Sequence, residues 1–348
     1  MPWIGVPLYP YILITLLMAS LSFILLVIKL SRVAWLCGIF LVMYSMVVFV
    51  LSKEYSVFLY TFTIIVSYLF IAQSDELEKI KIKIYNINVF YITLSLSFIL
   101  INFTWSPHIE GRYAVFVGDA NFSAFWLLLT VFSFFYIYKR NILLRNILAF
   151  GCIAWILYMT QSRMGLLAVI LFFSMFYFIK YKKISIFIGL SILFFSIFGQ
   201  LLVYYAFESF LRVDDLNVTT LFDKISNLND SSNLMRVNSY YYAFSQLTET
   251  PYNFLFGVQN YIENIPANLA IAHNWHMIMS ALYGTIYSSL FTIYIIWLIY
   301  KLQKYAGLLY VVILMSGILN INGVLIPIIF ISFLYFINNS CNRGLCKI

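Results

Sequence analysis

The sequence predicts an all-α integral membrane protein with about eleven transmembrane helices and one large extracytoplasmic loop before the ninth helix. The chain of 348 residues is 63% hydrophobic and only 10% charged, whereas soluble domains carry about 25% charged residues. Apolar runs of roughly twenty residues recur along the whole length, and helices satisfy their own backbone hydrogen bonds in lipid. Basic residues also cluster in every second connection between these runs.

The apolar runs place the expected helices in order along the chain. They lie at about 8–28, 33–51, 55–72, 87–104, 116–138, 146–160, 164–180, 184–203, 276–300, 305–320 and 323–337. The last two are short for a hydrocarbon core of about 30 Å, so a re-entrant pair is an alternative there. We expect one polytopic domain over residues 1–348, with residues 204–272 as the extracytoplasmic loop.

The charge pattern predicts the orientation of the chain. If every run crosses once, fifteen of the 21 basic residues fall on one side of the membrane. The positive-inside rule makes that side cytoplasmic, with the N-terminus outside and the C-terminus inside. The net charge of +8 therefore reflects topology. No loop has the dense basic run of a nucleic-acid-binding surface, so we expect no nucleic-acid partner.

The other six basic residues fall on the outer side, against this bias. They are Lys53, Arg112, Arg163, Arg212, Lys224 and Arg236. Arg163 stands between two apolar runs with almost no loop between them. A guanidinium at a membrane boundary is costly unless it is paired or wetted, and it marks a functional site by default. The alternative is an interfacial side chain that snorkels to water.

Two outer segments carry further polar residues. Gly118-Asp119-Ala120-Asn121 indicates a turn that feeds a helix, with Asp119 or Asn121 able to cap its free N–H groups. In the large loop, the pattern from Met235 to Leu247 suits an amphipathic helix that Pro251 and Gly257 then break.

The segment Ala272-His273-Asn274-Trp275-His276 closes the large loop. His273 and His276 are three residues apart, which predicts one face of a helical turn. Two histidines could begin a zinc site, but the ligands nearby are too few for the usual set. We therefore expect no metal and no cofactor. A histidine at a water–membrane boundary is better suited to act as a general base.

Taken in order, four segments resemble the superfamily of O-antigen polymerases and O-antigen ligases. They are Arg112 with Gly118-Asp119-Ala120-Asn121, then Thr160-Gln161-Ser162-Arg163-Met164-Gly165, then Arg236 through Phe256-Gly257-Val258, and last Ala272-His273-Asn274 with Tyr283-Gly284. The resemblance covers roughly residues 105–300. The chain departs from the family pattern at Ala120, Met164, Gln259 and Ala272, and it keeps the arginine and histidine positions.

The resemblance implies glycosyl transfer at the outer face of the bacterial cytoplasmic (inner) membrane. The donor is an oligosaccharide on undecaprenyl diphosphate. Arg163, Arg112 and Arg236 would bind the diphosphate through planar guanidinium groups, and His273 would accept the proton of the attacking sugar hydroxyl. Asn274, Asp119 and Asn121 would support these residues. The expected reaction inverts the anomeric carbon and needs no metal.

Among the functions open to such a chain, we favour a polymerase that joins one lipid-linked repeat unit to another. A ligase, whose acceptor is the lipid A core, is the alternative. A chain-length regulator in the membrane is a further candidate partner, which the sequence does not identify. A flippase or other transporter ranks lower, because transporters more often show internal repeats, broken helices and charges at mid-membrane.

Overall fold

The computed structural model describes the chain over residues 32–52, 56–73, 108–109, 112–113, 120–137, 141–207, 231–266, 269 and 272–317, together with 328, 331, 332 and 335. Within these residues the protein is helical apart from one short hairpin and a few turns. The apolar runs predicted at 8–28 and 87–104, and most of the run at 323–337, lie outside the described residues.

Each of the other eight predicted apolar runs corresponds to a helix. In chain order these helices are α2 (Arg32–Ser52), α3 (Ser56–Gln73), α5 (Ala120–Ile137), α6 (Ile142–Thr160), α7 (Arg163–Phe178), α8 (Lys182–Phe207), α12 (Trp275–Lys301) and α13 (Ala306–Ser316). A 3-10 turn, η2 (Gln303–Tyr305), precedes α13. Two-residue strands β1 (His108–Ile109) and β2 (Arg112–Tyr113) pair in an antiparallel hairpin.

Three of these helices are long and apolar enough to cross a membrane, over Ile142–Thr160, Lys182–Leu202 and Trp275–Lys301. Five further apolar helices in the described residues are shorter. The protein is thus helical and suited to a membrane, while the number of eleven crossings stays a prediction.

Large apolar side chains cover the outside of the bundle, as expected for contact with lipid tails. Val50 of α2 is 72% exposed, Leu143 of α6 is 71% exposed, and Phe187 of α8 is 71% exposed. Such continuous apolar exposure is rare on soluble monomers. These helices therefore present a surface that a bilayer would cover.

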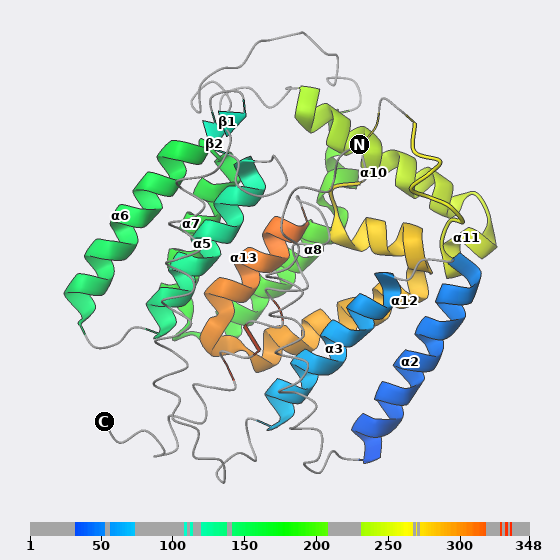
Figure 1. Ribbon diagram of the computed structural model, residues 1–348, viewed down its shortest axis with the longest axis horizontal. Coiled ribbons are helices and arrows are strands. Elements are labelled where there is room, and N and C mark those ends of the chain that lie inside the picture. The colour runs from blue at the N-terminus through cyan, green and yellow to red at the C-terminus, as the bar shows by residue number, and fades with distance from the viewer. Residues whose placement is uncertain are drawn as a thin grey trace.

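Helices α2, α3, α5, α6, α7, α8 and α13 run between two opposite faces of the bundle, whereas α10 and the first part of α12 lie across one of these faces (Figure 1). Strand β2 of the hairpin contacts α5 and α6 at one of these faces (Figure 1); we call this the hairpin face. The basic residues Arg145, Lys180, Lys182, Lys183, Lys301 and Lys304 stand at the helix ends of the other face.

The predicted large loop contains a folded part on the hairpin face. The amphipathic pattern forms α10 (Ser231–Thr248), and Pro251 begins a separate short helix, α11 (Pro251–Phe256), that ends at Gly257. The predicted break is thus confirmed. Helix α8 continues to Phe207, past the predicted helix limit at 203, so residues 204–207 of the predicted loop are helical, and the placement of the loop outside the membrane stays a prediction.

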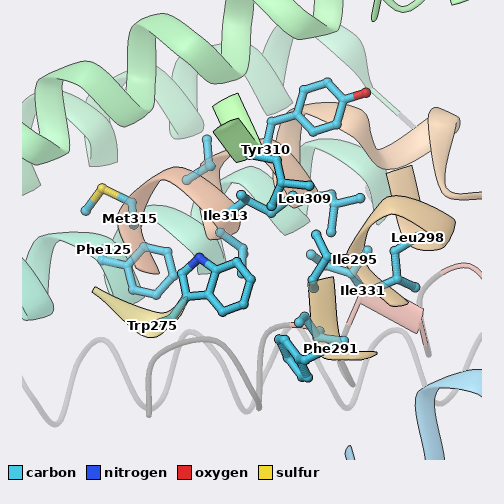
Figure 2. Packing of buried hydrophobic residues seen from close by; sticks show 14 of the residues in the cluster. Phe125, Trp275, Phe291, Ile295, Leu298, Leu309, Tyr310, Ile313, Met315 and Ile331 are labelled. Atoms are coloured by element: carbon cyan, nitrogen blue, oxygen red, sulfur yellow. The ribbon is translucent and has the colours of Figure 1, made fainter. Parts of the chain in front are cut away.

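A core of aromatic and aliphatic side chains joins α5, α12 and α13 in the middle of the bundle. Figure 2 shows Phe125, Trp275 and Ile313 among this cluster. Buried hydroxyls connect the outer helices to it: Thr61 of α3 shares a hydrogen bond of 2.8 Å with Tyr287 of α12 and another with Ser45 of α2. Such interhelical hydrogen bonds stabilise helices where no water competes.

Candidate functional site

The first polar junction joins the beginnings of α5 and α7 on the hairpin face. Ser162 is the N-cap of α7, and its hydroxyl accepts a hydrogen bond of 3.0 Å from the Gly165 N–H. The same hydroxyl donates to the side-chain oxygen of Asn121 at 2.8 Å. A Cβ at Gly165 would lie only 3.2 Å from Ala124. The two helices therefore approach closely beneath a Ser162–Asn121 bridge.

Arg163 is the first residue of α7 and is half-buried. The first turn of a helix offers N–H groups that have no partner within the helix; in α7 the Ser162 hydroxyl already accepts from that of Gly165, and the helix dipole favours an anion at this end. A guanidinium at this position adds a full positive charge with planar donors. The start of α7 is therefore suited to binding a phosphate group.

The capping role predicted for Asp119 or Asn121 is wrong for Asn121. Helix α5 begins at Ala120, so Asn121 lies inside its first turn and bonds across to Ser162 instead. Asp119 lies outside the described residues. Arg112 lies in strand β2, which contacts both α5 and α6, and the role of its side chain stays a prediction.

The second polar junction joins α8, α12 and α13 at Asn274. This residue is fully buried and is the N-cap of α12, accepting a hydrogen bond of 3.0 Å from the Met277 N–H. Its amide nitrogen donates to the carbonyl oxygens of Ser196 in α8 and Gly317 at the end of α13. Asn274 therefore holds three helices together, which is a structural role in addition to any catalytic one.

The expectation that His273 and His276 share one face of a helical turn is wrong. Because Asn274 caps α12 with an extended backbone, His273 precedes the helix and only His276 lies within its first turn. The His276 ring packs edge-on against Trp275, with 5.5 Å between ring centroids. Within the described part of the chain, no three His, Cys, Asp or Glu residues come together as a metal-ligand set.

Sequence reasoning missed Gln200, which belongs to the same junction. Its side-chain nitrogen donates to the His273 carbonyl oxygen at 3.0 Å and to the Gly317 carbonyl oxygen at 3.5 Å. The available signal was a lone amide near the end of the apolar run 184–203. Polar side chains inside apolar spans are energetically costly, so they usually pair with another polar side chain or with a backbone carbonyl.

Sequence reasoning also gave Tyr261 no separate role, although it lies beside the His273 segment. The ring is 1% exposed and stacks on Tyr242, with centroids 6.3 Å apart. Burial raises the pKa of the Tyr261 hydroxyl, the Tyr242 hydroxyl adds to this rise, and the Ala272 backbone N–H opposes it. No hydrogen bond of normal geometry reaches this hydroxyl from the described residues.

Replacing Tyr261 with phenylalanine is expected to leave the thermal unfolding temperature unchanged or to raise it. The reason is that the buried Tyr261 hydroxyl makes no hydrogen bond of normal geometry with the described residues, and a poorly satisfied buried hydroxyl costs free energy. Tyr240 is the matched control: it is equally buried, but its hydroxyl donates to the Ile197 carbonyl oxygen at 2.9 Å. Tyr240→Phe should cost about 1 kcal/mol. Thermal unfolding in detergent compares them, and equal losses would contradict the expectation.

Arg236 comes from a third place, the helix α10 that covers the hairpin face. It is half-buried, and α10 packs against both α8 and α12. The Tyr240–Ile197 hydrogen bond, one turn later in α10, fastens this helix to α8. Arg236 is therefore carried by an element that is fixed to both helices of the second junction.

Two glycines lock the α10–α11 segment against α12. Gly257, after α11, and Gly284, inside α12, have φ values of 93° and 84°, in the region that favours glycine. A Cβ at Gly257 would lie 2.7 Å from the Leu282 carbonyl, and one at Gly284 would lie 2.5 Å from the Leu255 carbonyl carbon. Helix α12 is broken at Gly284, and the backbone of α11 fills the break.

The contacts of the break satisfy backbone groups that an intact helix would have paired. The Val258 N–H donates to the Ala281 carbonyl oxygen at 2.6 Å, and the Thr285 hydroxyl donates to the Phe254 carbonyl oxygen at 2.7 Å. The half-helix that follows His273 is therefore held from two sides, by Asn274 at its start and by α11 at its end.

The predicted residues thus come from three places on one face: Asn121 with Arg163, His273 with Asn274, and Arg236 on the covering helix. Helix α13 packs against both α7, which begins at Arg163, and α8, which carries Gln200. No protein-family model, curated protein or solved structure matches this chain.

Proposed function

We propose that this protein is a membrane glycosyltransferase that polymerises a surface polysaccharide from undecaprenyl-diphosphate-linked repeat units. The observation that carries the proposal is Arg163 at the first position of α7, next to an N-cap that is bonded to Asn121. A guanidinium and a helix N-terminus at the same point favour a di-anionic phosphate. The lipid-facing surface of the same bundle suits a donor with a polyprenyl tail.

In the proposed reaction, a hydroxyl oxygen of the acceptor sugar attacks the anomeric carbon of the donor. The bond from that carbon to the phosphate oxygen breaks, and undecaprenyl diphosphate leaves with the electron pair. His273 accepts the hydroxyl proton. Arg163, with Arg112 and Arg236, stabilises the negative charge that develops on the leaving group. A single displacement inverts the anomeric carbon.

A ligase would use the same donor site and differ in its acceptor, the lipid A core. A transporter has one observation in its favour, because broken helices are common at transporter binding sites and α12 is broken at Gly284. Here, however, the backbone of Leu255 and Phe256 fills the break. Because backbone atoms occupy the break, the break favours a structural role in packing α11 against α12 over a role as a substrate-binding site.

Reconstitution in proteoliposomes tests the proposal. The purified protein is supplied with an undecaprenyl-diphosphate-linked oligosaccharide, and mass spectrometry follows the products. A polymerase yields glycans lengthened by whole repeat units together with free undecaprenyl diphosphate. A ligase lengthens nothing until lipid A core is added. Donor that crosses the bilayer unchanged would overturn the proposal and support a transporter.

Arg163→Lys is expected to lower the transfer rate by about 10- to 100-fold, since a lost charge-assisted hydrogen bond is worth about 1.5–3 kcal/mol and lysine cannot make the bidentate contact. The control is Arg145→Lys at the opposite face, where the guanidinium lies 4.8 Å from the Phe135 ring centroid. That variant should keep the wild-type rate. A wild-type rate for Arg163→Lys would indicate a snorkelling role instead.

A further inference from the structure

We infer that Gln200 is a positioning residue for His273; the inference deepens the proposed function and rests on it. Gln200 contacts the histidine through the backbone, because its amide nitrogen donates to the His273 carbonyl oxygen at 3.0 Å. His273 precedes α12, so no helical hydrogen-bond ladder fixes its conformation. The hydrogen bond from Gln200 comes from outside α12 and fixes the backbone position from which the His273 side chain extends.

Gln200 acts with Asn274 as an amide clamp, which we define as these two side chains and the carbonyl oxygens of Ser196, His273 and Gly317. Ser196 and Gln200 are one turn apart on α8, and each takes part in one hydrogen bond to the His273–Asn274 pair. Both amides also donate to the Gly317 carbonyl oxygen, at 3.5 Å and 3.4 Å. His273 is therefore held directly from α8, and its neighbour Asn274 is held from both α8 and the end of α13.

The clamp lies where α8 and the end of α13 approach closely. A Cβ at Gly317 would lie 2.5 Å from the Ser196 Cβ and 2.8 Å from its Cα. Close packing of this kind leaves little freedom for the helix backbones that carry the clamp. The position of His273 is consequently tied to a rigid part of the bundle.

The Gln200 amide is oriented with its nitrogen toward the carbonyl oxygens of His273 and Gly317. Two carbonyl oxygens face the side-chain nitrogen, so the reversed amide would bring oxygen against oxygen. In the observed orientation the Gln200 Oε1 is buried and has no hydrogen-bond partner among the described residues. A buried acceptor left unpaired is unfavourable. The Gln200 side chain therefore keeps its hydrogen bond to the His273 carbonyl oxygen, although its own Oε1 then has no partner among the described residues.

The test compares Gln200→Met, which keeps the length of the side chain and removes its donors, with Tyr310→Phe. Tyr310 is the matched control because its hydroxyl also bonds α13 to α8, donating to the Ser185 carbonyl oxygen at 2.8 Å. That bond lies fifteen residues away along α8, about 22 Å on a helix. Both variants lose one or more α8–α13 contacts, but only Gln200→Met releases His273.

Gln200→Met is expected to lower kcat about 10- to 100-fold, since a small misplacement of a catalytic group can cost about 100-fold. The donor KM should stay within about twofold, because the arginines are untouched. Tyr310→Phe should lower the unfolding temperature and keep kcat. Wild-type kcat in Gln200→Met, or parallel losses of kcat in both variants, would overturn the inference.

A second readout is independent of turnover. The chain has only three histidines, so NMR of histidine-labelled protein can follow His273, assigned with His273→Ala. Gln200→Met should shift the His273 signal, Tyr310→Phe should not, and an unshifted signal would overturn the inference. If Gln200→Met does not purify, the shorter Gln200→Asn is measured with the same expectations. If the wild-type protein has no transferase activity but Gln200→Met still shifts the His273 signal, the proposed function is wrong and the positioning of His273 by Gln200 stands.

Discussion

Replacing His273 with alanine is expected to lower turnover by about 10²–10⁴-fold, the range for loss of a positioned general base. Binding of the lipid-linked donor should remain nearly intact, because the proposed diphosphate contacts come from the arginines. The measurements are kcat in proteoliposomes and, separately, retention of the labelled donor by the purified variant. A comparable loss of donor binding would mean that His273 holds the substrate and does not act as a base.

The control for this prediction is His276→Ala. His276 lies inside the first turn of α12 and packs against Trp275, so its loss should affect turnover far less. Treatment of the wild-type protein with EDTA should leave activity in place. If both histidine variants failed alike, and added zinc restored activity after chelation, a shared metal would replace the general base in the mechanism.

Replacing Gly284 with alanine is expected to give the largest loss of stability among the variants considered. A Cβ there would overlap the Leu255 carbonyl, 2.5 Å from its carbon atom, and the φ value of 84° is strained for any other residue. The backbone conformation costs about 1–2 kcal/mol, and overpacking adds about 1–3 kcal/mol. Their sum is a large part of the typical 5–15 kcal/mol of a folded domain.

Gly151→Ala is the control for the glycine prediction. Gly151 lies within α6, and a Cβ there would meet no atom within 4 Å. Alanine stabilises a helix interior by about 0.5–1 kcal/mol relative to glycine, so this variant should be as stable as wild type or more so. Gel filtration and thermal unfolding in detergent compare the two. A monodisperse Gly284→Ala variant with the wild-type unfolding temperature would contradict the close packing of the α11 backbone against Gly284.

The helices were predictable from the sequence because their cause is local. A run of apolar residues in lipid has to satisfy its own backbone, and a helix does so within the segment. The run at 33–51 became α2 and the run at 55–72 became α3 with nearly the predicted ends. Breaks from proline and glycine were also local, as Pro251 and Gly257 show at the two ends of α11.

The ends that were misjudged depend on contacts from elsewhere in the chain. Helix α8 continues to Phe207, beyond the predicted limit at 203, and α10 packs along it. The predicted cap at Asn121 is instead a bridge to Ser162, 41 residues later. A capping pattern describes only the residues beside it, so it could not reveal a partner on another helix.

By itself, the sequence determined that this protein is helical and apolar on its outside, and it pointed to Arg163 and to the His273–Asn274 pair as unusual polar residues in an apolar chain. Only the tertiary structure decided what holds these residues. Gln200 lies 73 residues before His273, and Gly284 meets the backbone of Leu255 across a break in α12. Local propensity carries no information about such pairings, because they form only when packed helices bring distant backbone groups within hydrogen-bonding distance.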